Sequence, residues 1–598
     1  MSESLVGVIE PATRQNAGRA EKVVPSGAVN GPAGTETAAV MVVLGSERPA
    51  RFSQVAAVSH PHAPARASHR RRAVIILDVQ SSAGWVEEQA ALLRQAAGLY
   101  NVPVRLSYLC GLAAVCGLAF AAPQGTAFNA RDNGAKGDGK TDDTAALQKI
   151  IDDAGARGGG TAYVPPGDYA IRPIELRSGV TLYLEAGATL IASGNLADYP
   201  LETQQREGES ARVGLITVRH CHNVTIAGHG AIEGSGLLFV DATRVKTADD
   251  SDLKYTRQGA DFMNPKFGTQ DGPWVPVRDR PGNLLRVMDS EDFELTGVTV
   301  RNSPAWTCEM YHSRNINIHH ARIHSLTSNL HVPNDDGIDV NGCERVHISD
   351  MDIQTGDDCI ALFSGNNITV ANSTLRSRSA GVRIGYYAGT LRDVVINNVV
   401  IDDSNRGINL NVRNGNVVES VLLSNITIHT RLITGQWWGK GEPIVVTAMV
   451  NPRNPGTVGA IHGVHFRDIR IDSEAGVLIY GERPGMIEDL GFDGIHERIH
   501  KGPLEESYGG NFDLRGNTRP ELALFGHDIP AWFAHGVTGL ALHDVGVEWE
   551  DGLPPFYTHA VEIEDSKDID LRNVRGKAAR PGIEPMLFER CEGVRSTQ

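Results

Sequence analysis

The chain has 598 residues and a formal net charge of -16, from 56 Lys and Arg against 72 Asp and Glu. This acidic balance argues against binding to nucleic acid or another polyanion, because like charges repel. With 65 Gly and 41% hydrophobic residues, the composition is that of a turn-rich globular protein rather than a disordered one. No run of about eighteen uninterrupted apolar residues occurs, so we expect no membrane-spanning helix.

A signal-like segment stands at residues 103–122. Arg105 precedes an apolar run that ends in small residues, which is the order of a secretory signal. Such signals begin chains, so we expect translation to start near Val102 or Val104, with residues 1–102 as a spurious or disordered extension. The mature, secreted or periplasmic protein is then residues 123–598. A buried helix of a genuine N-terminal domain is the alternative.

Outside this segment the chain has five cysteines, and none has the spacing of a zinc site. We therefore expect buried thiols with one bridge at most, and neither a metal nor another cofactor. The five are Cys221, Cys308, Cys343, Cys359 and Cys591.

A short helix is predicted next. Asp142-Asp143-Thr144 precedes an apolar stripe at Leu147, Ile150, Ile151 and Ala154, which indicates an N-capped helix with one buried face. Such a helix suits the open end of a solenoid, which needs a cap.

Pairs of apolar residues five positions apart recur after residue 224. From Leu295 to Leu423 their successive first members are separated by 23, 30, 22, 26 and 27 residues, a period typical of stacked supersecondary units. This pattern predicts an all-β parallel β-helix, in which each coil pairs with the next. The pairs are Leu295/Val300, Ile318/Ile323, Ile348/Ile353, Val370/Leu375, Ile396/Ile401, Leu423/Ile428, Phe466/Ile471 and Leu542/Val547.

Asparagines lie between the paired strands, where a residue tolerant of left-handed backbone can turn a corner. They are Asn372, Asn397, Asn398 and Asn425. Residues 239–283 and 423–466 lack the period, so we expect long loops there that shape a binding site.

Two acidic phrases are separated by one coil. Asn334-Asp335-Asp336-Gly337 and Gly356-Asp357-Asp358 place Asp336 and Asp358 22 residues apart, so the solenoid should stack them on adjacent turns. Crowded carboxylates push one pKa upward, which leaves a protonated acid beside ionised bases, as glycoside hydrolysis requires.

These phrases resemble the two aspartate motifs of glycoside hydrolase family 28, the polygalacturonase and rhamnogalacturonase family. The resemblance runs from about Phe128 to Val574. It implies a right-handed, single-stranded, pectin-lyase-like parallel β-helix. It also implies an inverting mechanism, with Asp357 as the general acid and with Asp336 and Asp358 holding and deprotonating the attacking water. Acid and base should then lie about 6.5 to 9.5 Å apart.

The chain departs from the family at two motifs. Ser379-Ala380-Gly381 falls where the family has Gly-His-Gly, so Ala380 replaces the active-site histidine. Asn409 and Asn411 replace the Arg and Lys that grip the substrate carboxylate, and an amide cannot pair with a carboxylate as a cation does. Either the sugar is neutral or differently substituted, or nearby arginines have taken over. Those arginines are Arg383, Arg406 and Arg413.

Sugar binding also favours flat apolar side chains. Trp437 and Trp438 stand within a Gly-flanked loop, and adjacent residues cannot share one face of a strand. The predicted substrate-binding set is Asn334, Arg383, Arg406, Asn409, Asn411, Trp437 and Trp438.

The sequence thus predicts a glycosidase that acts on a pectic polysaccharide or oligosaccharide, with no cofactor and no membrane or nucleic-acid partner, as a monomer. Two alternatives remain. A β-helix polysaccharide lyase would use clustered aspartates to bind calcium and Arg383 as its base. A non-catalytic carbohydrate-binding solenoid would use the same fold without turnover.

Overall fold

The computed structural model describes residues 127–202, 212–245, 254–262, 274–276, 279–325, 331–434, 438–452, 455–515 and 519–597. The predicted segments 1–102 and 103–122 lie outside these residues, as does Trp437.

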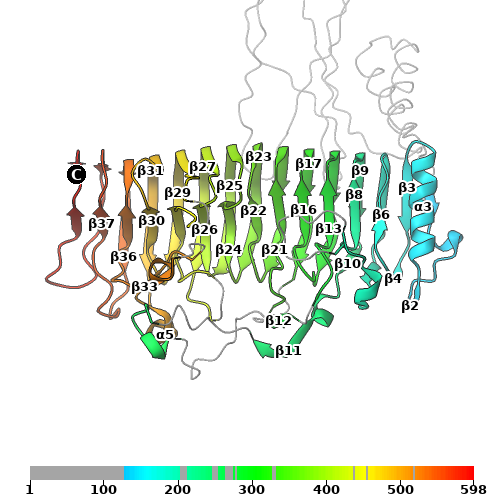
Figure 1. Cartoon of the computed structure of the whole chain (residues 1–598), viewed down its shortest axis with the longest axis horizontal. Coiled ribbons are helices and arrows are strands. Elements are labelled where there is room, and N and C mark those ends of the chain that lie inside the picture. The colour runs from blue at the N-terminus through cyan, green and yellow to red at the C-terminus, as the bar shows by residue number, and fades with distance from the viewer. Residues whose placement is uncertain are drawn as a thin grey trace, which may run out of the picture. The chain divides into compact units, whose positions relative to one another are not determined.

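The described strands form two long parallel sheets, and their partners follow the chain from coil to coil. The first sheet has thirteen described strands: β5 (Ile174–Glu175), β8 (Ile216–Arg219), β13 (Leu285–Met288), β16 (Cys308–Tyr311), β19 (Ile338–Asn341), β22 (Ile360–Leu362), β24 (Ala380–Gly385), β26 (Arg406–Val412), β28 (Ile444–Ala448), β30 (Val477–Gly481), β34 (Trp532–His535), β37 (Val561–Glu564) and β39 (Met586–Glu589). We call it the site sheet. Figure 1 shows its strands stacked side by side along the solenoid, with the C-terminus at one end.

The second sheet is called the back sheet and has twenty-three described strands: β1 (Ala127–Asn129), β2 (Asp138–Asp142), β3 (Gly160–Val164), β4 (Gly167–Ile171), β6 (Val180–Leu184), β7 (Ala188–Ala192), β9 (His222–Gly228), β10 (Ala231–Glu233), β14 (Glu291–Thr296), β15 (Thr299–Arg301), β17 (Arg314–His319), β18 (Arg322–His324), β20 (Cys343–Ser349), β21 (Asp352–Thr355), β23 (Gly365–Ser377), β25 (Thr390–Ser404), β27 (Val417–Thr430), β29 (Ala460–Ser473), β31 (Ile487–Ile499), β35 (Val537–His543), β36 (Gly546–Trp549), β38 (Asp570–Arg572) and β40 (Arg595–Thr597).

The apolar pairs of the sequence become two ladders of the back sheet. Leu295 pairs with Ile318, which pairs with Ile348, while Val300 pairs with Ile323 and so on along the stack. Their side chains belong to one continuous buried core between the sheets. The predicted right-handed parallel β-helix is therefore confirmed.

The corner asparagines explain how each back-sheet coil bends. Asn372, Asn398 and Asn425 have φ values of 51°, 55° and 54°, in the left-handed region that asparagine tolerates. Asn397 does not share this conformation and pairs in the strand ladder with Ala371, so its corner role was predicted wrongly.

The capping helix is α3 (Thr144–Ala156), and its buried residues are the four predicted ones. It lies at the N-terminal end of the stack in Figure 1. Asp143 makes no side-chain cap hydrogen bond; its carboxylate instead accepts the N–H groups of Lys136 and Gly137 at 2.6 and 2.8 Å. The carboxylate of Asp143 therefore binds the loop before the helix and does not cap the helix.

Excursions from the coils gather on one side of the stack in Figure 1. They include the antiparallel pairs β11 (Val240–Val245) with β12 (Trp274–Pro276) and β32 (Asn511–Asp513) with β33 (Leu524–Gly526), and the short helices α5 (Glu505–Tyr508) and α6 (Pro520–Ala523). The predicted loop 423–466 is only partly a loop, because β28 lies within it and continues the site sheet. All five cysteines outside the signal-like segment are free thiols.

Candidate active site

Three aspartates meet where adjacent coils enter the site sheet. Asp336 and Asp358 each stand two residues before their strands, β19 and β22, and the Gly337 N–H donates to the Asp358 carbonyl at 2.9 Å. One carboxylate oxygen each from Asp336, Asp357 and Asp358 lies within 4.8 Å of the others. We call these residues the aspartate cluster. The coil spacing therefore does bring the two phrases together.

The turn that carries Asp357 is held by groups that the sequence had not singled out. The Asp335 carboxylate accepts the N–H groups of Gly356 and Asp357 at 3.1 and 2.9 Å, and buried His331 lies 3.6 Å from Asp335. A Cβ on Gly356 would come within 1.8 Å of the His331 ring, so only glycine fits there. Asp335 thus positions the turn. Its place beside Asp336 in the sequence was the available signal.

Burial and like charge raise the pKa of Asp336 well above its usual range; the neighbours are Asp357, Asp339 and Asp358, in falling order. Asp339, on β19, is fully buried and has a pKa raised by burial and by Glu309. No hydrogen-bond partner for the Asp336 Oδ1 or for either Asp339 oxygen is found among the described residues. Both shifts favour the protonated forms of Asp336 and Asp339, because several carboxyl groups are crowded together and buried.

Arg383, on β24, partly neutralises the cluster. Its Nε donates to Asp358 Oδ2 and its Nη2 lies 3.3 Å from Asp358 Oδ1. Burial opposes the charge, but the attraction of Asp358 outweighs it and raises the pKa of Arg383. The Ser379 hydroxyl and the Ala380 N–H also donate to Asp358 Oδ1, at 2.9 and 3.1 Å. Arg383, Ser379 and Ala380 thus all hold the carboxylate of Asp358.

Aromatic rings surround Arg383. Its guanidinium carbon lies 5.3 Å from the ring centroids of Tyr386 and Trp438, and these two rings lie 5.6 Å apart. Arg413 donates to the Tyr386 hydroxyl at 3.0 Å. Asn334, in a left-handed turn, donates to Asp357 Oδ2 at 3.4 Å and accepts from Arg280 at 3.1 Å. Trp438 and Asn334 therefore lie beside the aspartate cluster.

Arg406 belongs to a separate buried group, which we call the arginine cluster: Arg406, Lys440, Glu442, Asp513 and Arg515. The Arg406 guanidinium lies 3.3 Å from Glu442 and donates to the Asp513 carbonyl at 2.5 Å. Arg515 pairs with the Asp513 carboxylate at 2.7 Å. Burial raises the pKa of Asp513, but Arg515 and Arg406 outweigh this effect and lower it. The cluster ties the loop that carries Trp438 to β32.

Asn409 and Asn411 lie on the outward face of β26, since Ile408, Leu410 and Val412 point into the core. Asn409 pairs in register with Arg383 of the neighbouring strand. The structure thus places both asparagines on the outward face of the strand next to Arg383.

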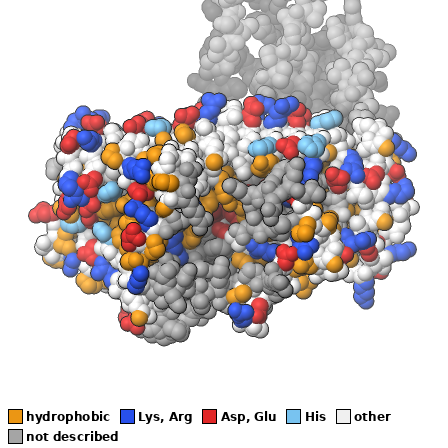
Figure 2. Space-filling view, viewed as in Figure 1, with side chains coloured by type: hydrophobic (Ala, Val, Ile, Leu, Met, Phe, Trp, Pro, Cys, Tyr) orange, Lys and Arg blue, Asp and Glu red, His pale blue; other side chains and the backbone are white. Residues whose placement is uncertain are grey.

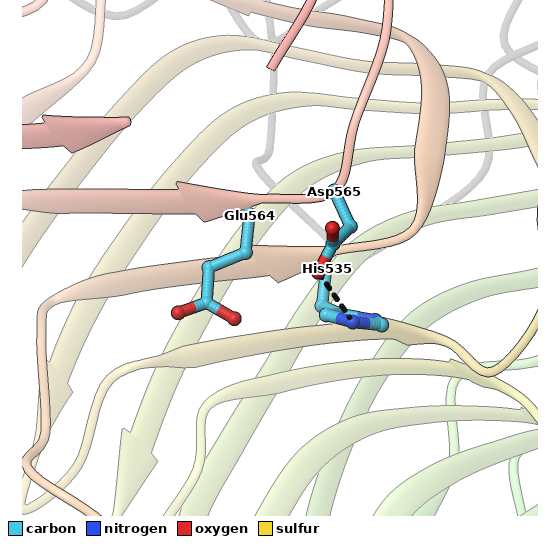
Figure 3. Close-up of side chains that lie close together, drawn as sticks. All are labelled: His535, Glu564 and Asp565. Carbon is cyan, nitrogen blue, oxygen red and sulfur yellow. Dashed lines mark ion pairs between the residues drawn. The ribbon is translucent and has the colours of Figure 1, made fainter. Parts of the chain in front are cut away.

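A second group of metal-ligand type is His535, Glu564 and Asp565 (Figure 3). His535 lies 3.3 Å from Asp565, and the Arg590 guanidinium lies 2.7 Å from Asp565 and 3.4 Å from Glu564. An arginine thus supplies the countercharge that a cation would bring. In the aspartate cluster Arg383 does the same for Asp358.

The fold and the aspartate cluster define a carbohydrate-active solenoid, and comparison with known proteins specifies the family. The model of the family described as "Glycosyl hydrolases family 28" matches residues 160–478, more than half of the chain. The chain belongs to this family, which is one of glycosidases.

Several relatives are polygalacturonases by name. A probable polygalacturonase of Vitis vinifera is 27% identical over 369 residues, which cover 56% of this chain and 67% of that protein. An exo-poly-alpha-D-galacturonosidase of Dickeya chrysanthemi is 25% identical over 47% of this chain and 51% of its own length. The chain thus spans about half to two thirds of these relatives. A family 28 exopolygalacturonase of Yersinia enterocolitica has a similar fold, with a TM-score of 0.52 at 17% identity and with 78% of each chain covered.

Both signs of charge are interspersed over the face shown in Figure 2, so no single-sign patch there marks a polyanion-binding surface. Among the described helices, none has the length and apolar character needed to cross a membrane.

Proposed function

We propose that this protein hydrolyses glycosidic bonds of a pectic polysaccharide or oligosaccharide, as a polygalacturonase-like enzyme. The observation that carries the proposal is the aspartate cluster, three buried carboxylates brought from two adjacent coils in a member of glycosyl hydrolases family 28. The names of its relatives supply the pectic substrate class.

In the proposed reaction Asp357 is the general acid that protonates the leaving sugar oxygen. It is the most exposed of the three, at 7%, so it is the one that a bound sugar reaches first. Asp336 and Asp358 hold and deprotonate the water. Asp336 offers an oxygen with no partner among the described residues, while Arg383 pairs with the Asp358 carboxylate. The proton held at Asp336 can move within the cluster to the acid.

The spacing of the cluster is known from its nearest oxygens. One oxygen of each carboxylate lies within 4.8 Å of the others, whereas the roughly 6.5 to 9.5 Å of an inverting pair separates whole carboxyl groups. A retaining reaction needs a free nucleophilic carboxylate, but Asp358 is held by Arg383, Ser379 and Ala380. These contacts favour inversion, and the anomer of the first product decides the question.

The test is a digest series on polygalacturonan, rhamnogalacturonan and neutral glycans, with and without chelator. We expect new reducing ends without ultraviolet absorbance, unaffected by chelator, and a first product of inverted anomeric configuration by NMR. Asp357→Asn should abolish hydrolysis of the polymer but retain more activity on an aryl glycoside with a good leaving group, which needs no acid. Equal loss on both substrates would remove Asp357 from that role.

The lyase alternative is less favourable because Arg383 keeps its proton beside Asp358, so it cannot serve as a base. Unsaturated, chelator-sensitive products would nevertheless establish it. Isothermal binding without turnover would establish the non-catalytic solenoid. Secretion and a monomeric state stay predictions, since the signal-like segment lies outside the described residues. The N-terminal sequence of the native protein and its sedimentation test them.

A further inference from the structure

Several buried polar side chains on the outward face of the site sheet have no hydrogen-bond partner among the described residues. They include both side-chain atoms of Asn409, Oδ1 of Asn411 and Oγ1 of Thr447. All three residues are at least 95% buried. Asn411 pairs in register with Thr447 on β28, so the groups lie together on neighbouring strands. We call these three residues the amide subsite.

Buried polar groups without partners cost stability, so a set of them kept together indicates a ligand that completes their hydrogen bonds. The amide subsite contains both donors and acceptors: the Asn409 amide N–H groups and the Thr447 hydroxyl donate, while two amide oxygens and the same hydroxyl accept. Sugar hydroxyls donate and accept as well. A carboxylate only accepts, so it would leave the oxygens of Asn409 and Asn411 unmatched.

The arginines near the amide subsite are committed elsewhere. Arg383 is paired with Asp358, and Arg406 is bound by Glu442 and Asp513. Arg413 donates to the Tyr386 hydroxyl and stacks on its ring at 4.7 Å. Nη1 of Arg383 and Nε of Arg413 nevertheless have no hydrogen-bond partner among the described residues, and a sugar hydroxyl oxygen can accept from them as a carboxylate oxygen can.

The acidic side of the site strengthens this argument. Asp336 and Asp339 are both buried and lie close to Asp358. Arg383 already forms an ion pair with Asp358. A substrate carboxylate placed next to Asn409 would therefore add another carboxyl group to a site that already crowds several around one arginine. Bringing it there would require desolvation without an ion pair to compensate.

We propose that the amide subsite binds an uncharged sugar residue through its hydroxyl groups, next to the bond that is cut. This inference rests on the proposed hydrolase function and names its substrate class. The shared chemistry is a sugar ring without a free carboxylate. A neutral hexose or deoxyhexose provides it, and so does a uronate whose carboxyl group is esterified.

The test compares kcat/KM on three matched oligosaccharides: free oligogalacturonide, its methyl ester, and the carboxyl-reduced form. Wild-type protein should favour an uncharged form over the free uronate by at least tenfold. Activity on the reduced form identifies a neutral sugar, whereas activity confined to the methyl ester identifies an esterified uronate. Equal or better turnover of the free uronate overturns the inference.

The double variant Asn409→Arg, Asn411→Lys should favour the free uronate over the uncharged forms by at least tenfold in kcat/KM, because it introduces cations at the amide subsite. The matched control is Val400→Arg with Val395→Lys, which adds the same charges to exposed positions of β25 on the back sheet and should leave the preference unchanged. A reversal in the control as well would mean that net charge, not the amide subsite, sets the preference.

A milder variant covers the case in which the double variant does not fold. Asn411→Ala should lower kcat/KM on the preferred uncharged substrate about tenfold and should lower it less on the free uronate. Equal loss on both substrates overturns the inference. If wild-type protein hydrolyses free polygalacturonan best and Asp357→Asn abolishes that activity, the proposed function stands and this inference alone falls.

Discussion

The aspartate cluster and the arginine cluster are both buried, but they differ in how their charges are balanced. In the arginine cluster each carboxylate faces a guanidinium, and backbone N–H groups of Gly439 and Lys440 complete the shell at 2.5 Å. In the aspartate cluster one arginine serves several carboxylates, and oxygens of Asp336 and Asp339 lack partners among the described residues. A cluster whose charges and hydrogen bonds are all paired stabilises the fold. A cluster with unpaired polar groups stabilises the fold less, but those groups can bind a substrate.

The largest expected effect separates activity from stability at the aspartate cluster. Asp336→Asn should lower kcat/KM by about 10² to 10⁴, the usual contribution of a general acid or base. The same change should raise the melting temperature, because it removes a carboxyl group that its neighbours disfavour. Asp393→Asn, at an exposed corner of β25, is the matched control and should change neither quantity. Lower stability in Asp336→Asn would contradict the comparison.

The arginine cluster should behave in the opposite way. Asp513→Asn leaves Arg406 and Arg515 without their shared carboxylate, and breaking a buried ion pair in this manner costs about 3 to 5 kcal/mol. Denaturant unfolding measures the loss. The KM of the folded variant, measured at low temperature, should change little. A large rise in KM with an unchanged free energy of unfolding would instead support the substrate-binding role that the sequence predicted for Arg406.

Lys440 provides a pH test of the same cluster. Burial, reinforced by Arg515, lowers the pKa of Lys440 from 10.5 to about 7. With Lys440 neutral, two arginines balance Glu442 and Asp513. Because the unfolded chain then binds more protons between pH 7 and about 10, the free energy of unfolding should rise with pH in that window, by at most about 1.4 kcal/mol per unit.

Lys440→Met should abolish that rise while leaving the rest of the stability profile in place. Thermal melts at pH 6, 7, 8 and 9 make the comparison. Lys567→Met is the control, since Lys567 is an exposed residue paired with Glu592. A profile of Lys440→Met that still rises like the wild type would assign the pH dependence to another group.

Most of the scaffold could be predicted from the sequence because a solenoid repeats one local rule. Leu295 and Val300 recur with a period equal to one coil, so the same period that builds the ladders also stacks Asp336 on Asp358. Arg383, one of the three arginines that the sequence analysis named, stands 25 residues after Asp358, about one coil, and the structure pairs them.

The parts that escaped prediction lie where the chain leaves the repeat. Asp513 reaches Arg406 across 107 residues through an excursion with no period, so nothing local marks their contact. The strand β28 was missed because its coil lacks the five-residue apolar pair at the usual interval. Asp335, inside the first acidic phrase, and His331, just before that phrase, support the turn of Asp357, but the chemistry of the phrase drew attention to the other aspartates.

Glu497 gives the smallest expected effect and the sharpest test of the ladder rule. It pairs in register with Ile471 and Val547, so it takes the place of an apolar residue inside the solenoid. Burial raises the pKa of Glu497 well above its usual value, and Trp532 opposes this shift. A raised folded-state pKa means that the native chain binds more protons than the unfolded one above pH 4.5, so stability should fall as pH rises from there.

Glu497→Gln keeps the shape, removes the titration and should be more stable than wild type by about 1 to 2 kcal/mol at pH 8, with little difference at pH 4. Urea unfolding at the two pH values measures this, with exposed Glu488→Gln on the same strand as control; equal gains at both pH values would show that packing, not the buried charge, limits this coil.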